Sequence, residues 1–151
     1  MKTKKNHRKS ETPKSFADEA CPLCGSEMKE NRSKLTFPVN GEEIEVLELP
    51  HLQCHKCNEI VLRLDESKLL REQALNVYRQ KYGLLPADEI RRLRERLDLT
   101  QGELAELLRL GVNTISRWES DRNVQTAAMD VLLRLVRDVP GSIEYLRSLA
   151  A

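Results

Sequence analysis

Hydrophobic and polar residues alternate in the first third of the chain, on both sides of Asn40-Gly41. A period of two is typical of a strand with one buried face, and Asn-Gly between two such runs favours a two-residue hairpin turn. Residues 59–64 predict a further short strand. The alternating apolar positions are Leu35, Phe37, Val39, Ile44 and Val46.

From residue 66 onward the apolar positions follow a helical period. Over residues 66–82 they share one face, at Leu70, Ala74, Val77 and Tyr78, and Gly83 is suited to end this helix in the left-handed conformation. After a short joint ending at Pro86, the pattern predicts only helices, over residues 87–97, 100–108, 113–120, 126–137 and 141–149.

These patterns predict two small domains joined by a helix, which suits a chain of 151 residues. The first is β-rich and the second is an all-α bundle of about five helices. The expected boundaries are 1–17 for a disordered basic arm, 18–65 for the β-rich domain, 66–85 for the connecting helix and linker, and 86–151 for the helical domain.

The net charge of +1 conceals an uneven distribution. Residues 1–17 carry six Lys or Arg against one Glu, whereas residues 18–64 carry five basic and nine acidic residues. Residues 86–151 carry ten arginines and eleven acidic residues, so overall charge alone does not indicate a nucleic-acid partner. No apolar run suits a membrane span or a secretory signal, and we expect a cytoplasmic protein.

Every cysteine belongs to a pair with two residues between the sulfurs: Cys21 with Cys24, and Cys54 with Cys57. This spacing directs both sulfurs of a pair toward one point, and two such pairs form a tetrahedral thiolate cage. The sequence therefore predicts a zinc ribbon with one structural Zn²⁺ per chain. Four thiolates leave no open coordination position, so we expect no catalytic metal and no enzyme.

Alternatives to zinc are iron in the same cage, a redox-active cysteine pair, and thiols without a metal. His51 and His55 lie near the second cysteine pair. Either could be a ligand, but four sulfurs already complete the site, so we expect both histidines to be ordinary surface residues.

A second motif lies in the helical part. Thr100 and Glu103 form a capping box that begins one helix, and a turn at Leu110-Gly111 leads into the next, which starts near Asn113. On that helix Asn113 and Arg117 lie on one side and Ile115 on the other. This arrangement is that of a helix-turn-helix, whose second helix enters the DNA major groove.

Asn and Arg are the side chains that pair with adenine and guanine edges, so Asn113 and Arg117 are the predicted base readers. The alternative is a structural bundle in which Asn113 caps the helix and Arg117 is solvated. Three further residues are candidates for phosphate or base-edge contacts, although solvent exposure also explains Gln101: Thr114, Ser116 and Gln101. Trp118 is expected to pack inside the helices, and Glu119 to meet an arginine of residues 87–97.

Residues 100–120 resemble the Xre/Cro-type helix-turn-helix family, with two departures. That family usually has Gly where this chain has Arg109, with the glycine here at Gly111, and Asp121 replaces a Gly that often ends the recognition helix.

The order of four-cysteine ribbon, connecting helix and helix-turn-helix resembles the MqsA-type antitoxins, which carry a YgiT-type zinc finger. The resemblance covers about residues 20–150. It implies that the zinc domain neutralises a ribonuclease-type toxin, and that the helical domain dimerises and binds a palindromic operator in its own promoter. It also implies that Asn113 and Arg117 are the DNA-reading pair.

Two other functions fit the same sequence: a stand-alone zinc-containing regulator without a toxin, and a small redox protein with iron in the cage. A dimer seam on the last two helices and a purely internal core also fit equally well. The apolar residues concerned are Met129, Leu132, Leu133, Leu135, Val136, Ile143, Leu146 and Leu149.

Overall fold

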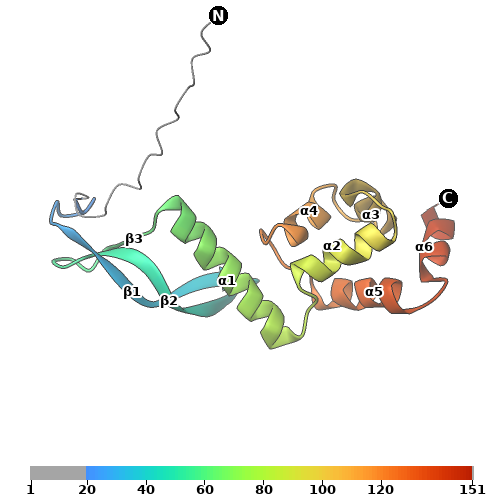
Figure 1. Ribbon diagram of the computed structural model, residues 1–151, viewed down its shortest axis with the longest axis horizontal. Helices are drawn as coiled ribbons and strands as arrows, with labels where there is room; N and C mark the ends of the chain where they lie inside the picture. The colour runs from blue at the N-terminus through green and yellow to red at the C-terminus, as the bar shows by residue number, and fades with distance from the viewer. Residues whose placement is uncertain (1–19, 151) are drawn as a thin grey trace, which may run out of the picture.

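The computed structural model describes residues 20–150, and the predicted basic arm over residues 1–17 lies outside them. A three-stranded sheet occupies one end of the molecule and helices α2 to α6 the other, with α1 lying against the sheet and leading toward the helices (Figure 1). Within the described residues, no helix has the length and apolar character needed to cross a bilayer.

The sheet is antiparallel with strand order β1-β2-β3. It contains β1 (Met28–Val39), β2 (Glu42–Cys54) and β3 (Ile60–Val61). Asn40 and Gly41 both have positive φ, of 50° and 83°, as a turn whose twist matches the two strands requires. The predicted hairpin is confirmed, and Phe37 pairs with Ile44 across it.

Helix α1 (Leu64–Tyr82) packs against the hairpin and ends at Gly83, which has a φ of 62°. The predicted apolar face is wrong at one position, because Val77 is 40% exposed while Leu75 is buried. Leu75 belongs to the same buried cluster as Val124, which lies after the helix-turn-helix motif, so the buried face of α1 includes the Leu75 side. The other buried members of this core are Val39, Ile44, Val46, Leu49, Leu70 and Ala74.

Five helices follow, close to the predicted ranges, and enclose a core that includes Ile90, Leu104, Ile115, Trp118 and Leu133. Trp118 is buried, as predicted. The helices are α2 (Ala87–Arg96), α3 (Gln101–Leu107), α4 (Thr114–Glu119), α5 (Ala127–Asp138) and α6 (Ser142–Ala150).

The turn between α3 and α4 differs from the expected one. Arg109 adopts the left-handed conformation, with a φ of 54°, whereas Gly111 does not. This backbone costs a residue with a side chain about 1 kcal/mol. The Arg109 guanidinium offsets that cost by donating a hydrogen bond to the carbonyl of Leu149, at 2.8 Å, and so ties the turn to α6.

A buried arginine connects α1 to the segment after α4. Arg79 is 2% exposed and donates hydrogen bonds to the carbonyls of Trp118, at 3.0 Å, and Asn123, at 3.2 Å. It also forms an ion pair with Asp121, whose φ of 51° is left-handed. Because the acceptors follow one another along one loop, a single guanidinium holds that loop against α1.

The joint between α1 and α2 is held by a second polar group, the buried carboxylate of Asp130 on α5. It accepts hydrogen bonds from the amide of Leu85 and from the side chains of Gln125 and Arg134. Arg134 also donates to the carbonyl of Gly83, at 2.7 Å. The joint is therefore fixed to the helices rather than left as a free tether.

Replacing Arg79 with Met is expected to lower the free energy of unfolding of the helical half by about 2–4 kcal/mol, since buried carbonyls and Asp121 lose their partner. Trp118 is the single tryptophan of the chain and one of the acceptors, so denaturant unfolding followed by its fluorescence measures the loss. Lys68→Met on the exposed side of the same helix is the matched control and should leave the transition in place. Equal transitions for both variants would contradict this role of Arg79.

Candidate metal centre and nucleic-acid interface

Two tight turns bring the cysteines together. Gly25 donates a backbone hydrogen bond to the carbonyl of Cys21, at 2.9 Å, and Asn58 donates to that of Cys54, at 3.0 Å. Both donors have positive φ, of 71° for Gly25 and 61° for Asn58, which glycine and asparagine tolerate best. The two turns are thus built alike, one before β1 and one after β2.

The four sulfur atoms form one cluster. All lie within 4.8 Å of one another, and those of Cys21 and Cys57, like those of Cys24 and Cys54, are 3.5 Å apart. A disulfide would bring two sulfurs to about 2.05 Å. A tetrahedral metal with bonds of about 2.3 Å instead separates its sulfurs by about 3.8 Å. The arrangement therefore fits a metal site and no disulfide.

The protonation of the cluster also favours a cation. Hydrogen bonds from Ser26 lower the pKa of Cys24 to about 6. A backbone hydrogen bond at Glu59 lowers the pKa of Cys57, but lost hydration and the adjacent sulfurs outweigh it and raise the pKa to about 12. Neighbouring thiolates repel one another, so all four ionise together only when a metal neutralises them.

The two histidines differ from expectation and from each other. His51 is 1% exposed, so the prediction that it is a surface residue was wrong. Its Nδ1 lies 2.8 Å from the carbonyl of Leu49, and its Nε2 lies 3.4 Å from the hydroxyl of Ser33. His55 is exposed, with Nδ1 2.9 Å from the carbonyl of Glu27. Both rings thus contact groups other than the sulfurs.

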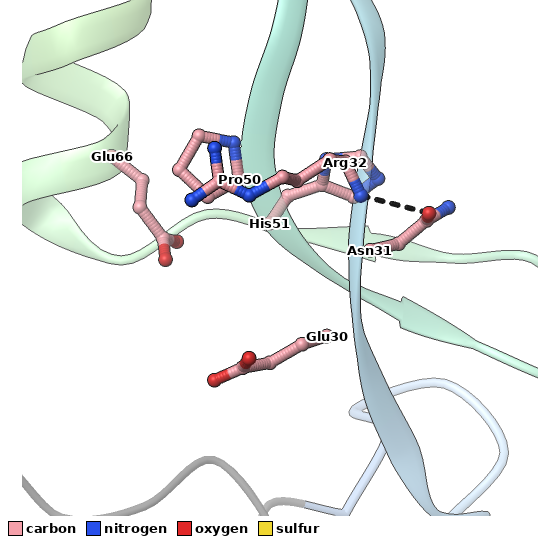
Figure 2. Close-up of a pocket in the computed structure, with 6 residues that line it drawn as sticks. All are labelled: Glu30, Asn31, Arg32, Pro50, His51 and Glu66. Carbon is pink, nitrogen blue, oxygen red and sulfur yellow. Dashed lines mark hydrogen bonds between the residues drawn. The ribbon is translucent and has the colours of Figure 1, made fainter.

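Beside His51, a groove of about 660 Å³ separates the sheet from the start of α1. Figure 2 shows the carboxylates of Glu30 and Glu66 reaching into the same space from the strand and from the helix. Arg32 is the basic residue among those lining the groove. Sequence reasoning did not identify this groove, because Glu30 and Glu66 are distant in the chain and Glu66 forms part of the capping box of α1, where its carboxylate accepts a hydrogen bond from the amide of Arg63, at 2.7 Å.

The predicted base readers lie side by side on the surface. Asn113 immediately precedes α4 and Arg117 follows one turn later, and both are exposed. Neither side chain has a hydrogen bond or ion pair to any other residue between 20 and 150. The alternative in which the Asn113 side chain caps α4 does not hold, because that side chain makes no capping hydrogen bond. Both groups are therefore available to a ligand.

The other candidates are less open. Thr114 and Ser116 are half-buried on α4. Gln101 is half-buried at the start of α3, and its side-chain amide donates to the Glu119 carboxylate, at 2.8 Å. One of its two amide hydrogens is thus used inside the protein, and the simple alternative of a solvent-exposed glutamine does not hold.

Glu119 is the polar centre of the helix-turn-helix. Burial alone raises the pKa of this carboxyl, but hydrogen bonds from Arg94 and Gln101 outweigh it and hold the pKa below its usual value. The ion pair with Arg94 has an N–O distance of 2.7 Å, and Arg91 contacts the same carboxylate at 3.7 Å. The expected arginine partner is therefore Arg94. Its contacts join α2, α3 and α4.

The apolar residues of α5 and α6 divide into two groups. Leu133 and Val136 belong to the core, and Met129, Leu132, Ile143 and Leu146 pack against it. The remainder stay exposed and recur every four residues along each helix, which places them on one face of each. These exposed residues are Val131, Leu135 and Val139 on α5 and at its end, and Tyr145 and Leu149 on α6.

The chain matches the family model of MqsA, the antitoxin component of a bacterial toxin–antitoxin system, over residues 19–147. It is also similar to antitoxin MqsA of Escherichia coli (strain K12), at 25% identity over 130 residues, which cover 84% of this chain and 98% of that protein. The matched range contains the four cysteines, α1 and the helix-turn-helix. The resemblance read from the sequence is confirmed.

Chelating the metal is expected to disorder the cysteine end of the ribbon only, because that end has its own core of Cys21, Met28, Leu52 and Cys54. Amide hydrogen exchange should accelerate in residues 20–30 and 50–61, while residues 35–46 stay protected by α1. Cys54→Ser should give the same pattern without chelator, and chelator should then add nothing. Loss of protection throughout the hairpin would contradict two separate cores.

Proposed function

The chain belongs to the MqsA family of antitoxins, and we propose that it neutralises a ribonuclease-type toxin through its metal-binding ribbon and represses its own operon through its helical half. The ribbon and the helices α2 to α6, to which the two activities are assigned, lie at opposite ends of the molecule (Figure 1). In this proposal the chain has two binding activities, one for a toxin protein and one for DNA.

The proposed metal is one structural Zn²⁺ per chain, held by Cys21, Cys24, Cys54 and Cys57. A closed set of four thiolates suits zinc and leaves no position for a substrate. The metal then supplies folding free energy to the cysteine end of the ribbon, which has a small core. Iron in the same cage would colour the purified protein, whereas zinc leaves it colourless.

The observation that carries the DNA proposal is the exposed, unpartnered pair of Asn113 and Arg117. An amide forms two hydrogen bonds to adenine, and a guanidinium forms two to guanine, in the major groove. Both groups lie on the outer side of the second helix of the helix-turn-helix, which is where a base-reading pair is expected. Thr114, Ser116 and Gln101 lie nearby and are proposed to contact phosphates or base edges.

The proposed operator is a palindrome read by a homodimer. The exposed apolar residues on α5 and α6, Leu135 and Tyr145 among them, form an apolar face that a second copy would cover. A two-fold dimer places its two α4 helices in half-sites about 34–36 Å apart.

The proposed toxin-binding surface lies at the metal end of the ribbon. Leu23, between the first two cysteines, is 71% exposed, and Leu64, at the start of α1, is 86% exposed. Large apolar side chains left in water by a fold commonly mark a protein interface. The groove lined by Glu30, Arg32 and Glu66 lies in the same half and offers a toxin two carboxylates and a guanidinium.

Asn113→Ala and Arg117→Ala are each expected to weaken binding to the chain's own promoter by about 1–3 kcal/mol, because each removes a bidentate base contact. Fluorescence anisotropy at fixed salt, with promoter and scrambled duplexes, measures the change. Arg92→Ala is the control, since Arg92 is an exposed arginine on α2 paired with Asp88. If both variants keep wild-type affinity, α4 is not the reading helix.

Coexpression of the tagged full-length chain with the product of the adjacent gene is expected to yield a stable complex with that protein. Leu23→Asp should weaken the complex, because it places a charge in the proposed apolar interface. The double variant Asn113→Ala/Arg117→Ala serves as the control and should retain the toxin while losing the promoter. If the complex is lost only in the double variant, the toxin binds the helical half and the proposed site at the metal end is wrong.

A further inference from the structure

Val112 is the most exposed large apolar residue of the helical half, at 72%. It lies in the turn that leads into α4, between Gly111 and Asn113. The amide of Thr114 donates a hydrogen bond to the carbonyl of Gly111, at 2.9 Å, and closes this turn. Val112 and Asn113 are therefore its two corner residues, and both side chains are in solvent.

The fold gives no reason for a valine at this corner. None of the hydrophobic clusters in residues 20–150 includes Val112, whereas Leu110, two residues earlier, packs on the helical core. β-Branched residues are not favoured at such turn positions, where Pro, Asn, Asp, Ser and Gly dominate. The Val112 side chain neither packs on the core nor favours the turn conformation, so we attribute its presence to an external partner.

Its position indicates the partner. Val112 is the residue before Asn113, whose free amide suits an adenine edge, and one helical turn later Arg117 suits guanine. An apolar side chain beside such groups has one complementary feature in the major groove, the 5-methyl group of thymine. Phosphates and the polar edges of the other bases offer it nothing comparable.

We propose that Val112 contacts the 5-methyl group of a thymine next to the bases read by Asn113 and Arg117, and so helps determine operator sequence. This inference rests on the proposed DNA binding by α4. It adds a discrimination that hydrogen bonding alone does not supply, since it favours thymine over cytosine, which lacks the methyl group. Every half-site should then contain a thymine at one fixed distance from the adenine and guanine.

The test is a thermodynamic cycle with the full-length protein and promoter DNA in which single thymines are replaced by deoxyuridine, which removes only the methyl group. Substitution at the same thymine position in both half-sites should lower affinity about 16-fold, because each of the two protomers returns one apolar carbon, worth about fourfold, to water. Val112→Ala should lower affinity for thymine DNA by a similar factor. On the matching deoxyuridine DNA the same variant should bind as the wild type does.

Two controls separate the possible outcomes. Leu47→Ala removes an equally exposed apolar side chain from β2 and should not change affinity on either DNA. Trp118 fluorescence checks that the Val112→Ala variant is folded. The thymine contact is overturned if deoxyuridine has no effect at any position. It is also overturned if the affinity losses from Val112→Ala and from deoxyuridine are additive when the two changes are combined. Either result leaves the roles of Asn113 and Arg117 intact. If Asn113→Ala and Arg117→Ala also have no effect, the proposed DNA function fails as well.

Discussion

The arrangement of this molecule depends on one buried guanidinium. Arg79 comes from the helix that carries the ribbon, and its acceptors, Trp118, Asp121 and Asn123, lie at the end of α4 and just beyond it. A buried charge is tolerated when it is paired and hydrogen-bonded, and here the end of α4 and the loop after it supply partners to both terminal nitrogens of Arg79, whereas its Nε has none among the described residues. The orientation of α1 and the position of that loop are thus determined by the same contacts.

The buried polar contacts of α4 lie on its inner side, so the proposed DNA-reading residues on its outer side are left free. The Glu119 carboxylate gathers Arg94 and Gln101 from α2 and α3 and fixes α4 from its inner side. The side chains of Asn113 and Arg117, on the outer side, make no hydrogen bond or ion pair within the described part of the chain. A six-residue helix has little stability of its own, so its position must come from tertiary contacts of this kind.

The features that were predictable from sequence share a local cause. The hairpin at Asn40-Gly41, the capping box at Thr100 and the cysteine turns each depend on residues within a few positions of one another. Arg79, His51 and Arg109 could not be placed in this way. The burial of Arg79 depends on partners about forty residues away, and the side chain of Arg109 finds its acceptor forty residues along the chain, in α6. The domain boundaries and the DNA contacts stay predictions.

The arginines of the helical half show why local geometry matters more than charge count. Ten arginines in residues 86–151 suggest a strongly basic surface, yet six of them hydrogen-bond to protein groups: Arg91, Arg92, Arg94, Arg109, Arg134 and Arg137. Carboxylates neutralise most of these, so the field available to attract phosphates is small. In the proposed complex, the helical half should therefore contribute little sequence-independent affinity. In that proposal, discrimination among DNA sites depends on the few side chains proposed to reach base edges, namely the amide of Asn113, the guanidinium of Arg117 and the exposed Val112.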